Sequence, residues 1–138
     1  MSHVYHQLYY HFAWGTHDRA PLIVPDIRQD LLRIQAEEVA KRGGILIRQN
    51  CMPDHMHLLV RMTPSIMVAD FIGQVKGATC YRFNRECSPR IPLRWQEGYG
   101  VLTLREGEVE DVAHYIDNQE RLHQRRKLSR VLELLEAT

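Results

Sequence analysis

The stretch Pro53–Val60 reads PDHMHLLV and places two histidines one residue apart inside an apolar run. A short apolar run bounded by turn residues is typical of a β-strand. Successive strand side chains point to opposite faces of a sheet, so His55, His57 and Leu59 are predicted to share one face. The two imidazoles would then lie about 6 to 7 Å apart along the strand, close enough to bind one metal ion together.

The same stretch determines how the preceding segment pairs with it. Residues Ile45–Met52 read ILIRQNCM and form a second predicted strand, separated from the histidine strand only by Pro53 and Asp54. A connection this short joins antiparallel neighbours, because a parallel pair needs a long crossover. The sequence therefore predicts an antiparallel pair that carries the histidines on one face.

Further elements flank this pair. The aromatic segment Val4–Trp14 and the segment Gly100–Leu104 are predicted to be strands. Helices are predicted over three ranges that begin at a capping residue or follow a glycine: Asp26 to about Arg42, Ser65 to about Cys87, and the residues after Gly107. This order predicts an α+β fold, namely a ferredoxin-like (split β-α-β) antiparallel sheet with helices on one face and an extra C-terminal helix.

Length and composition restrict the class of protein. The 138 residues suit one domain, predicted over 1–138, and the net charge of +1 gives no overall sign of nucleic-acid or membrane binding. No apolar run approaches the roughly 18 residues that a membrane span needs. Cys51, Cys80 and Cys87 form no CxxC pair, and the N-terminus does not resemble a signal sequence, so a cytoplasmic protein is predicted.

A second group of candidate residues lies on the predicted last helix. Tyr115 and Gln119 would lie one turn apart and offer a phenol and an amide oxygen, which suit the nucleophile and third metal ligand of a phosphoryl-transfer site. The alternative is a tyrosine at the rim of the core and a solvated glutamine. His114 points about 100° around the helix from Tyr115 and is given no role. Nothing in the sequence ties the four histidines near the N-terminus to the site: His3, His6, His11 and His17.

Four segments carry a resemblance to a known family: PDHMHLLV, QVKGATCYRFNR, RWQEGYG and VEDVAHYIDNQE. In order and spacing they resemble the single-tyrosine transposases of the HUH nuclease class, which belong to small bacterial insertion sequences of the IS200-like group. The histidine pair alone is a weak signal. Joined to the other segments at matching distances it is a strong one, and the resemblance covers nearly the whole chain.

The resemblance implies a role for each matched residue. His55 and His57 match the metal-binding histidines, Gln119 the third ligand, and Tyr115 the nucleophile. It implies a divalent metal, Mg²⁺ or Mn²⁺, and a transposase that cleaves and rejoins single-stranded DNA through a 5′-phosphotyrosine. The substrate would be single-stranded DNA with hairpins at the element ends. The chain would form a homodimer whose active sites are shared between subunits.

DNA contacts are expected from two basic segments. One contributes Lys76, Arg82 and Arg85, and the other, residues 121–130, contributes five cations that include Arg121 and Arg125. The alternative for both segments is a solvated charged face. A set of aromatic residues in the first strand could stack on bases, but the alternating pattern favours core and sheet-face positions instead: Tyr9, Tyr10, Phe12 and Trp14.

Two other functions remain open at this level. The first is a ferredoxin-like nucleic-acid-binding protein that descends from such a transposase and has lost catalysis. The second is a zinc protein that uses Cys51, His55 and His57, for which the sequence offers no evident fourth ligand.

Overall fold

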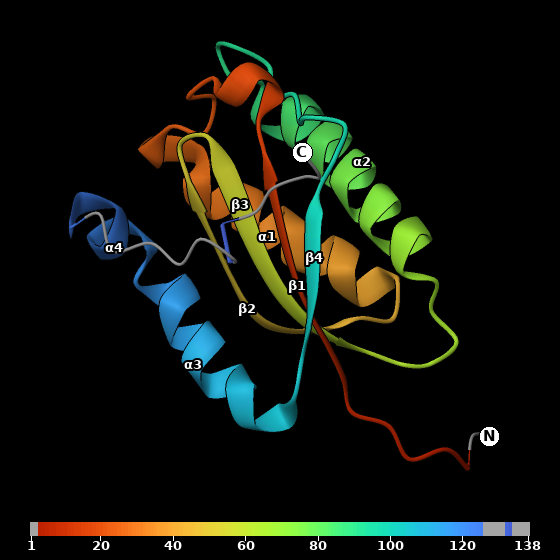
Figure 1. The fold of residues 1–138 in the computed structure, drawn as a ribbon. Coiled ribbons are helices and arrows are strands. Elements are labelled where there is room, and N and C mark those ends of the chain that lie inside the picture. Colours follow the sequence, from red (N-terminus) through yellow and green to blue (C-terminus); the bar gives the residue numbers. More distant parts are fainter. Residues whose placement is uncertain (1–2, 126–131, 134–138) are drawn as a thin grey trace.

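The sheet has four antiparallel strands, with helices on both of its faces (Figure 1). The computed structural model describes residues 3–125 and 132–133. A short 3₁₀ helix over His17–Arg19 follows the first strand. The other elements are, in order, β1 Leu8–Gly15, α1 Pro25–Lys41, β2 Ile45–Met52, β3 His55–Met62, α2 Val68–Cys87, β4 Gly100–Leu104, α3 Glu106–Asp117 and α4 Gln119–Arg125.

The strand order is β2-β3-β1-β4, and every neighbouring pair is antiparallel. This is the order of a ferredoxin-like sheet, so the predicted fold class is confirmed. The histidine strand β3 lies inside the sheet, between β1 and β2. His57 is paired with Ala13 on one side and with Asn50 on the other. The two histidines therefore lie on one of the two central strands of the sheet.

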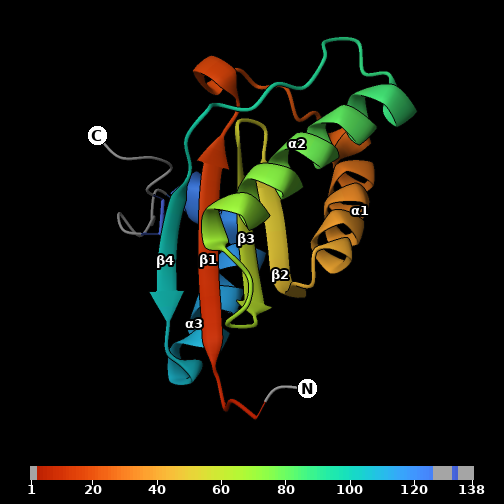
Figure 2. The same ribbon diagram turned by 90° about the vertical axis from the view of Figure 1, so that its right-hand side faces the viewer.

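The alternation along β3 separates two cores. Met56, Leu58 and Val60 point into the larger cluster, which packs against α1 and α2. Leu59 points to the other face and packs against Val112, Ala113 and Ile116 of α3. Figure 2 shows α1 and α2 on one side of the sheet and α3 on the other. The extra C-terminal helix thus covers the face that carries the histidines.

Two helices begin elsewhere than predicted. Helix α2 starts at Val68 rather than after Ser65, because the Ser65 hydroxyl pairs with Thr63 Oγ1 at 3.0 Å. Helix α1 starts at Pro25, whose ring fixes a helical φ and whose missing N–H costs nothing at this position. Strand β1 begins at Leu8 and not at Val4.

The predicted last helix is interrupted. Helix α3 ends at Asp117, and α4 begins at Gln119 after Asn118, whose backbone angles (φ −101°, ψ 20°) depart from the helix. The Asn118 side-chain amide donates to the carbonyl oxygen of His114 at 2.8 Å, which satisfies a helix-terminal acceptor. Tyr115 and Gln119 therefore lie on separate helices, and the prediction that one helix carries both was wrong. No helix among the described residues has the length and apolar character to cross a membrane.

A buried carboxylate joins α1 to α2. The Glu38 side chain is 3% exposed and contacts Arg82 at 2.7 Å, Arg42 at 2.7 Å and Lys41 at 2.9 Å. Burial alone would raise the pKa of Glu38, but the hydrogen bonds from these cations outweigh it and lower the pKa from 4.5 to about 2. The carboxylate is thus held in its ionised form.

We expect Glu38→Gln to lower the free energy of unfolding by about 2 kcal/mol at pH 7, because three cations lose the buried carboxylate that they share. Since the folded-state pKa is depressed, this stabilisation is present above about pH 4.5 and is lost as the pH falls towards 2. The difference between wild type and variant should therefore narrow over that range in denaturant unfolding. The matched control is Glu37→Gln, which removes a more exposed partner of Arg82 and should have a much smaller effect. Equal effects for both variants would contradict the prediction.

Candidate active site

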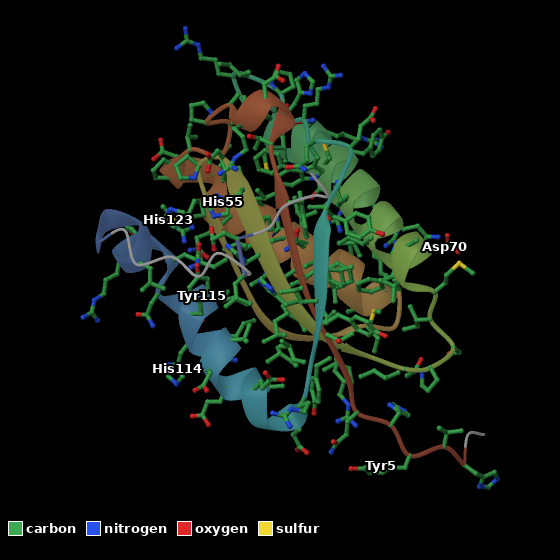
Figure 3. The ribbon with its side chains drawn as sticks, viewed as in Figure 1. Tyr5, His55, Asp70, His114, Tyr115 and His123 are labelled. Carbon is green, nitrogen blue, oxygen red and sulfur yellow. The ribbon has the colours of Figure 1, made fainter. Side chains whose placement is uncertain are left out.

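The two histidines of β3 lie side by side on the face covered by α3. His55 is 1% exposed and His57 is fully buried, and their ring centroids lie 5.1 Å apart. In Figure 3, His55, Tyr115 and His123 lie close together beside β3 and the C-terminal helices, whereas Tyr5 and Asp70 lie far away. The predicted shared face of the histidines is confirmed by the packing of Leu59 on the same side.

A carboxylate orients the first histidine. Asp54 Oδ1 lies 2.8 Å from His55 Nδ1, and Arg19 holds the other carboxylate oxygen at 3.0 Å. An Nδ1 proton donated to Asp54 leaves His55 Nε2 with a lone pair that faces the site. Burial lowers the pKa of His55, but hydrogen bonds to Glu133 and Asp54 outweigh it, so the pKa lies above its ordinary value.

The second histidine has a different neighbour. His57 Nδ1 lies 3.0 Å from Nε2 of His11, a residue of β1 that is 1% exposed. Burial outweighs the nearby Glu133 carboxylate and keeps the pKa of His57 below its ordinary value. Sequence reasoning gave His11 no part in the site. No local signal could have found it, because the register that pairs Ala13 with His57, and so brings His11 next to His57, is fixed only when β1 and β3 meet in the sheet.

Tyr115 lies against the histidine pair. Its ring is edge-on to that of His57, with centroids 6.1 Å apart and an interplanar angle of 79°. Its hydroxyl donates to Glu133 Oε2 at 2.8 Å. The side chain of the preceding residue, His114, is 68% exposed and points away from the site (Figure 3).

Glu133 is a member of the site that the sequence did not indicate. Its carboxylate oxygens lie 3.3 Å from His55 Nε2 and 3.0 Å from His57 Nε2. Burial alone would raise the pKa of Glu133, but contacts with these histidines and with Tyr115 outweigh it and hold the pKa well below its usual range. Glu133 is therefore an ionised carboxylate at the centre of the cluster. It lies 76 residues from His57, and no local pattern connects the two.

The amide of Gln119 also reaches the cluster. Gln119 is fully buried, and its Oε1 lies 3.4 Å from His55 Nε2 and 3.0 Å from His123 Nε2. Its Nε2 donates to the backbone oxygen of Tyr115 at 3.3 Å, which links the two sides of the break between α3 and α4. His123 was missed by sequence reasoning, although it follows Gln119 by four residues, the spacing of neighbours on a helix face.

This donor set fits a divalent cation. One donor atom from each of His55, His57 and Glu133 lies within 4.8 Å of the other two. Among the described residues, His57 Nε2 makes no hydrogen bond of good geometry, although it is buried. A buried ring nitrogen 3.0 Å from a carboxylate oxygen, on a ring that lies beside a second imidazole, is suited to share a metal ion with them. The site therefore offers two nitrogen donors and either a carboxylate or an amide oxygen.

Cys51 does not belong to this donor set. It is paired with Met56 across the β2–β3 ladder and is fully buried in the cluster under α1 and α2. That cluster lies on the opposite face of the sheet from His55 and His57, so a zinc site formed by these three residues was a wrong alternative. Burial raises the pKa of the Cys51 thiol to about 11, which keeps it protonated.

Cys51→Ser is accordingly expected to leave the divalent-metal affinity unchanged within about twofold. The free energy of unfolding should fall by roughly 1 to 2 kcal/mol, because a hydroxyl is placed in an apolar core. Mn²⁺ titration followed by electron paramagnetic resonance, together with zinc analysis of the purified protein, measures both metals. Zinc that is retained by the wild type and lost from the variant would contradict the placement of Cys51 outside the metal site.

Two of the residues expected to contact DNA have oxygen partners within this chain. Lys76 is 7% exposed, and its ammonium donates to the backbone oxygens of Gln96 at 2.9 Å and Gly98 at 2.8 Å. Arg82 contacts three carboxylates within 2.9 Å, those of Glu37, Glu38 and Glu86. Both charges thus have oxygen partners within this chain, and a role for either residue in phosphate contacts stays a prediction.

The other residues expected to contact DNA either lie at the surface or fall outside the described part of the chain. Arg85 and Arg121 are exposed. Arg125 ends α4, but its side chain, like residues 126–130, lies outside the described residues. Of the aromatic residues of β1, Phe12 and Trp14 are fully buried in the main core and Tyr9 is 9% exposed, as the core interpretation predicted.

Comparison with known proteins identifies relatives for nearly the whole chain. The model of a family described as "Transposase IS200 like" matches residues 4–119. The ISDra2 transposase TnpA of Deinococcus radiodurans is 30% identical over 120 residues, which cover 83% of this chain and 85% of that protein. A crystal structure at 1.90 Å of a D. radiodurans R1 protein described as a transposase is 28% identical and superposes with a TM-score of 0.69. It covers 86% of this chain and 95% of that chain.

A second solved structure has the same fold. It is a REP-associated tyrosine transposase bound to a REP hairpin, with 16% identity and a TM-score of 0.63, covering 89% of this chain and 74% of that chain. At this identity the likeness concerns the fold alone. The antiparallel sheet and these relatives together define the class, and the chain is a transposase. It belongs to the IS200-like transposase family, whose model matches most of its length.

Proposed function

We propose that this transposase cleaves and rejoins single-stranded DNA at insertion-sequence ends through a covalent 5′-phosphotyrosine on Tyr115. One observation carries the proposal. The Tyr115 hydroxyl and the ring nitrogens of His55 and His57 converge on one carboxylate, that of Glu133, within 3.3 Å. A potential nucleophile and a potential metal site thus share one buried cluster, which is the arrangement that phosphoryl transfer needs.

The chemistry follows from the tyrosine. Its oxygen attacks the scissile phosphorus, the bond from phosphorus to the 3′ oxygen breaks, and that oxygen takes up a proton from water to leave as a free 3′-hydroxyl. Because the phosphotyrosine conserves the phosphodiester bond, a second 3′-hydroxyl can attack it and join two strands without a nucleotide cofactor. A phenol with a pKa of about 10 must lose its proton. Among the described residues, Glu133 offers an acceptor oxygen within hydrogen-bond reach of that proton.

The metal would be Mg²⁺ or Mn²⁺, held by His55, His57 and an oxygen from Gln119 or Glu133. When bound, it would polarise the scissile phosphate and stabilise the charge that develops on the leaving oxygen. The family resemblance assigns the oxygen ligand to Gln119. The geometry of this chain also offers Glu133, whose carboxylate oxygens lie closer to the histidine nitrogens than the Gln119 amide does.

A pair of isosteric variants separates the two oxygen ligands. If Glu133 is the ligand, Glu133→Gln should weaken Mn²⁺ binding at least about tenfold, because an anionic ligand becomes neutral. In that case Gln119→Met, which removes the amide oxygen but keeps the length of the side chain, should change the affinity less than about threefold. Isothermal titration with Mn²⁺ measures both variants. The reverse ranking would assign the ligand to Gln119 instead.

The partners proposed are single-stranded DNA with hairpins at the element ends and a second copy of the chain. Of the basic residues expected to contact phosphates, Arg85 and Arg121 are exposed and remain candidates for this role. In a homodimer with shared sites, the helix that carries Tyr115 would serve the partner's histidines, although within one chain it lies beside its own His57. Light scattering of the protein with and without DNA should give the mass of two chains.

The test uses the full chain and labelled single-stranded DNA from the ends of the element that encodes it. With Mg²⁺ or Mn²⁺, we expect an adduct that resists denaturation and a shortened strand with a free 3′-hydroxyl. Omission of the metal should abolish both products. A protein that binds this DNA but forms no adduct would instead be a non-catalytic binding protein that retained only the fold.

A further inference from the structure

His11 is a buried histidine that the proposed reaction does not use. It lies on β1, which runs beside β3, and is 1% exposed. In the register of these strands it faces Leu59, while His57 faces Ala13 two residues away. Because side chains two residues apart share a face, His11 and His57 are diagonal neighbours under α3.

The two rings meet edge to edge. His11 Nε2 lies 3.0 Å from His57 Nδ1, and the ring planes differ by only 7°. The ring centroids are 5.2 Å apart, which exceeds the distance between the two nitrogens by about 2.2 Å. This difference is roughly the sum of the two distances from a ring centroid to its own nitrogen. The contact is therefore nearly collinear and lies in the plane of both rings. This is the geometry of an N–H···N hydrogen bond between a ring donor and a ring lone pair.

We propose that His11 is a positioning residue that accepts the Nδ1 proton of His57 and thereby holds the His57 Nε2 lone pair towards the metal site. A neutral imidazole carries one proton, so a proton fixed on Nδ1 leaves Nε2 free to act as a ligand. The inference rests on the proposed function, in which His57 is a metal ligand. His11 acts through His57 and contacts neither metal nor DNA.

Two observations support this direction of the hydrogen bond. Among the described residues, His57 Nδ1 has a hydrogen-bond partner of good geometry in His11, whereas His57 Nε2 has none and faces a Glu133 carboxylate oxygen at 3.0 Å, across the space that the metal would occupy. The other histidine is held in the same way, because Asp54 Oδ1 lies 2.8 Å from His55 Nδ1. In each of the two histidines, Nδ1 is thus held by a residue outside the ligand set. This arrangement orients histidine ligands in metal sites. The two supports differ in charge, since Asp54 is an acid and His11 an imidazole.

The direct test is the tautomer of His57 in the metal-free wild type. Long-range ¹H–¹⁵N correlation spectra of ¹⁵N-labelled protein distinguish a proton on Nδ1 from one on Nε2. We expect the Nδ1–H form for His57. The Nε2–H form would overturn the proposal, because His11 would then be the donor.

Three variants complete the test. His11→Leu, which removes the acceptor, should shift His57 towards the Nε2–H tautomer and weaken Mn²⁺ binding about tenfold or more. His11→Gln places an amide oxygen near the lost nitrogen and should restore the affinity to within about threefold of the wild type. The matched control is His6→Leu, a half-buried histidine before β1 that does not contact the site, and it should bind as the wild type does. Wild-type affinity in His11→Leu would overturn the proposal.

Failure of this inference differs from failure of the proposed function. If the wild type binds no Mn²⁺ or Mg²⁺, the metal-dependent function fails, and the tautomer of His57 still decides the role of His11. If the wild type binds metal and the His57 proton lies on Nε2 before metal is added, only the role of His11 fails. Should His11→Leu not fold, the wild-type spectra and His11→Gln decide the question.

Discussion

Tyr115→Phe is expected to abolish the covalent protein–DNA adduct and to reduce strand cleavage on the order of 10⁴-fold or more. The substitution removes only the hydroxyl, which donates to Glu133 at 2.8 Å, and keeps the ring that packs on His57. The variant should therefore fold, with a loss in the free energy of unfolding of about 1 kcal/mol from the missing hydrogen bond. DNA binding should be retained, because the substitution removes no positive charge that could contact a phosphate.

The neighbouring residue provides a matched control. His114 is exposed and lies on the same turn of α3, so His114→Phe alters the same helix without touching the cluster. It should form the adduct at a rate close to that of the wild type. Denaturing gel electrophoresis with end-labelled DNA measures both variants. An adduct in Tyr115→Phe would exclude Tyr115 as the nucleophile, whatever the effect on the overall rate.

His57→Ala is expected to weaken Mn²⁺ binding by more than about 100-fold and to reduce cleavage in proportion. Loss of a residue that only supports a ligand typically costs 10 to 100-fold in metal affinity, so loss of the donor itself should cost more. His57 is fully buried between β1 and β2, and the cavity should also lower the free energy of unfolding of the metal-free protein by about 2 kcal/mol. Thermal unfolding without metal separates this effect from the loss of the ligand.

The control for this prediction is His6→Ala, which removes an imidazole that does not contact the site. Its Mn²⁺ affinity and cleavage rate should match those of the wild type. Isothermal titration at a fixed pH measures the affinity, because ligand protons compete with the metal. Unchanged affinity in His57→Ala would remove His57 from the ligand set and leave His55 with the carboxylate of Glu133.

The local pattern predicted much of the fold. Alternation in Pro53–Val60 correctly separated the residues that face α3 from those that enter the main core, because strand side chains alternate by geometry alone. The two-residue link at Pro53 and Asp54 correctly made β2 and β3 antiparallel neighbours. The paired glycines after α1 also acted as expected, since Gly43 adopts a φ of 81° that other residues rarely reach.

Other features depended on competing local interactions. The hydroxyl of Ser65 found Thr63 rather than a helix N–H, so α2 began later than its sequence suggested. Asn118 interrupted the final helix, although the apolar spacing before it was regular. Lys76 and Arg82 looked like free cations in the sequence, but each found oxygen partners from other parts of the chain. Such choices depend on which partner lies nearest after folding.

The sequence by itself determined that His55 and His57 share one face of a strand and that Tyr115 lies on a helix after the last strand, because both follow from backbone periodicity. Only the tertiary structure decided that α3 covers that face, that Glu133 lies between the rings, and that His11 meets His57 edge to edge. The physical reason is range. Periodicity acts over a few residues, whereas these contacts join positions 18 to 78 residues apart whose proximity depends on the packing of the whole sheet.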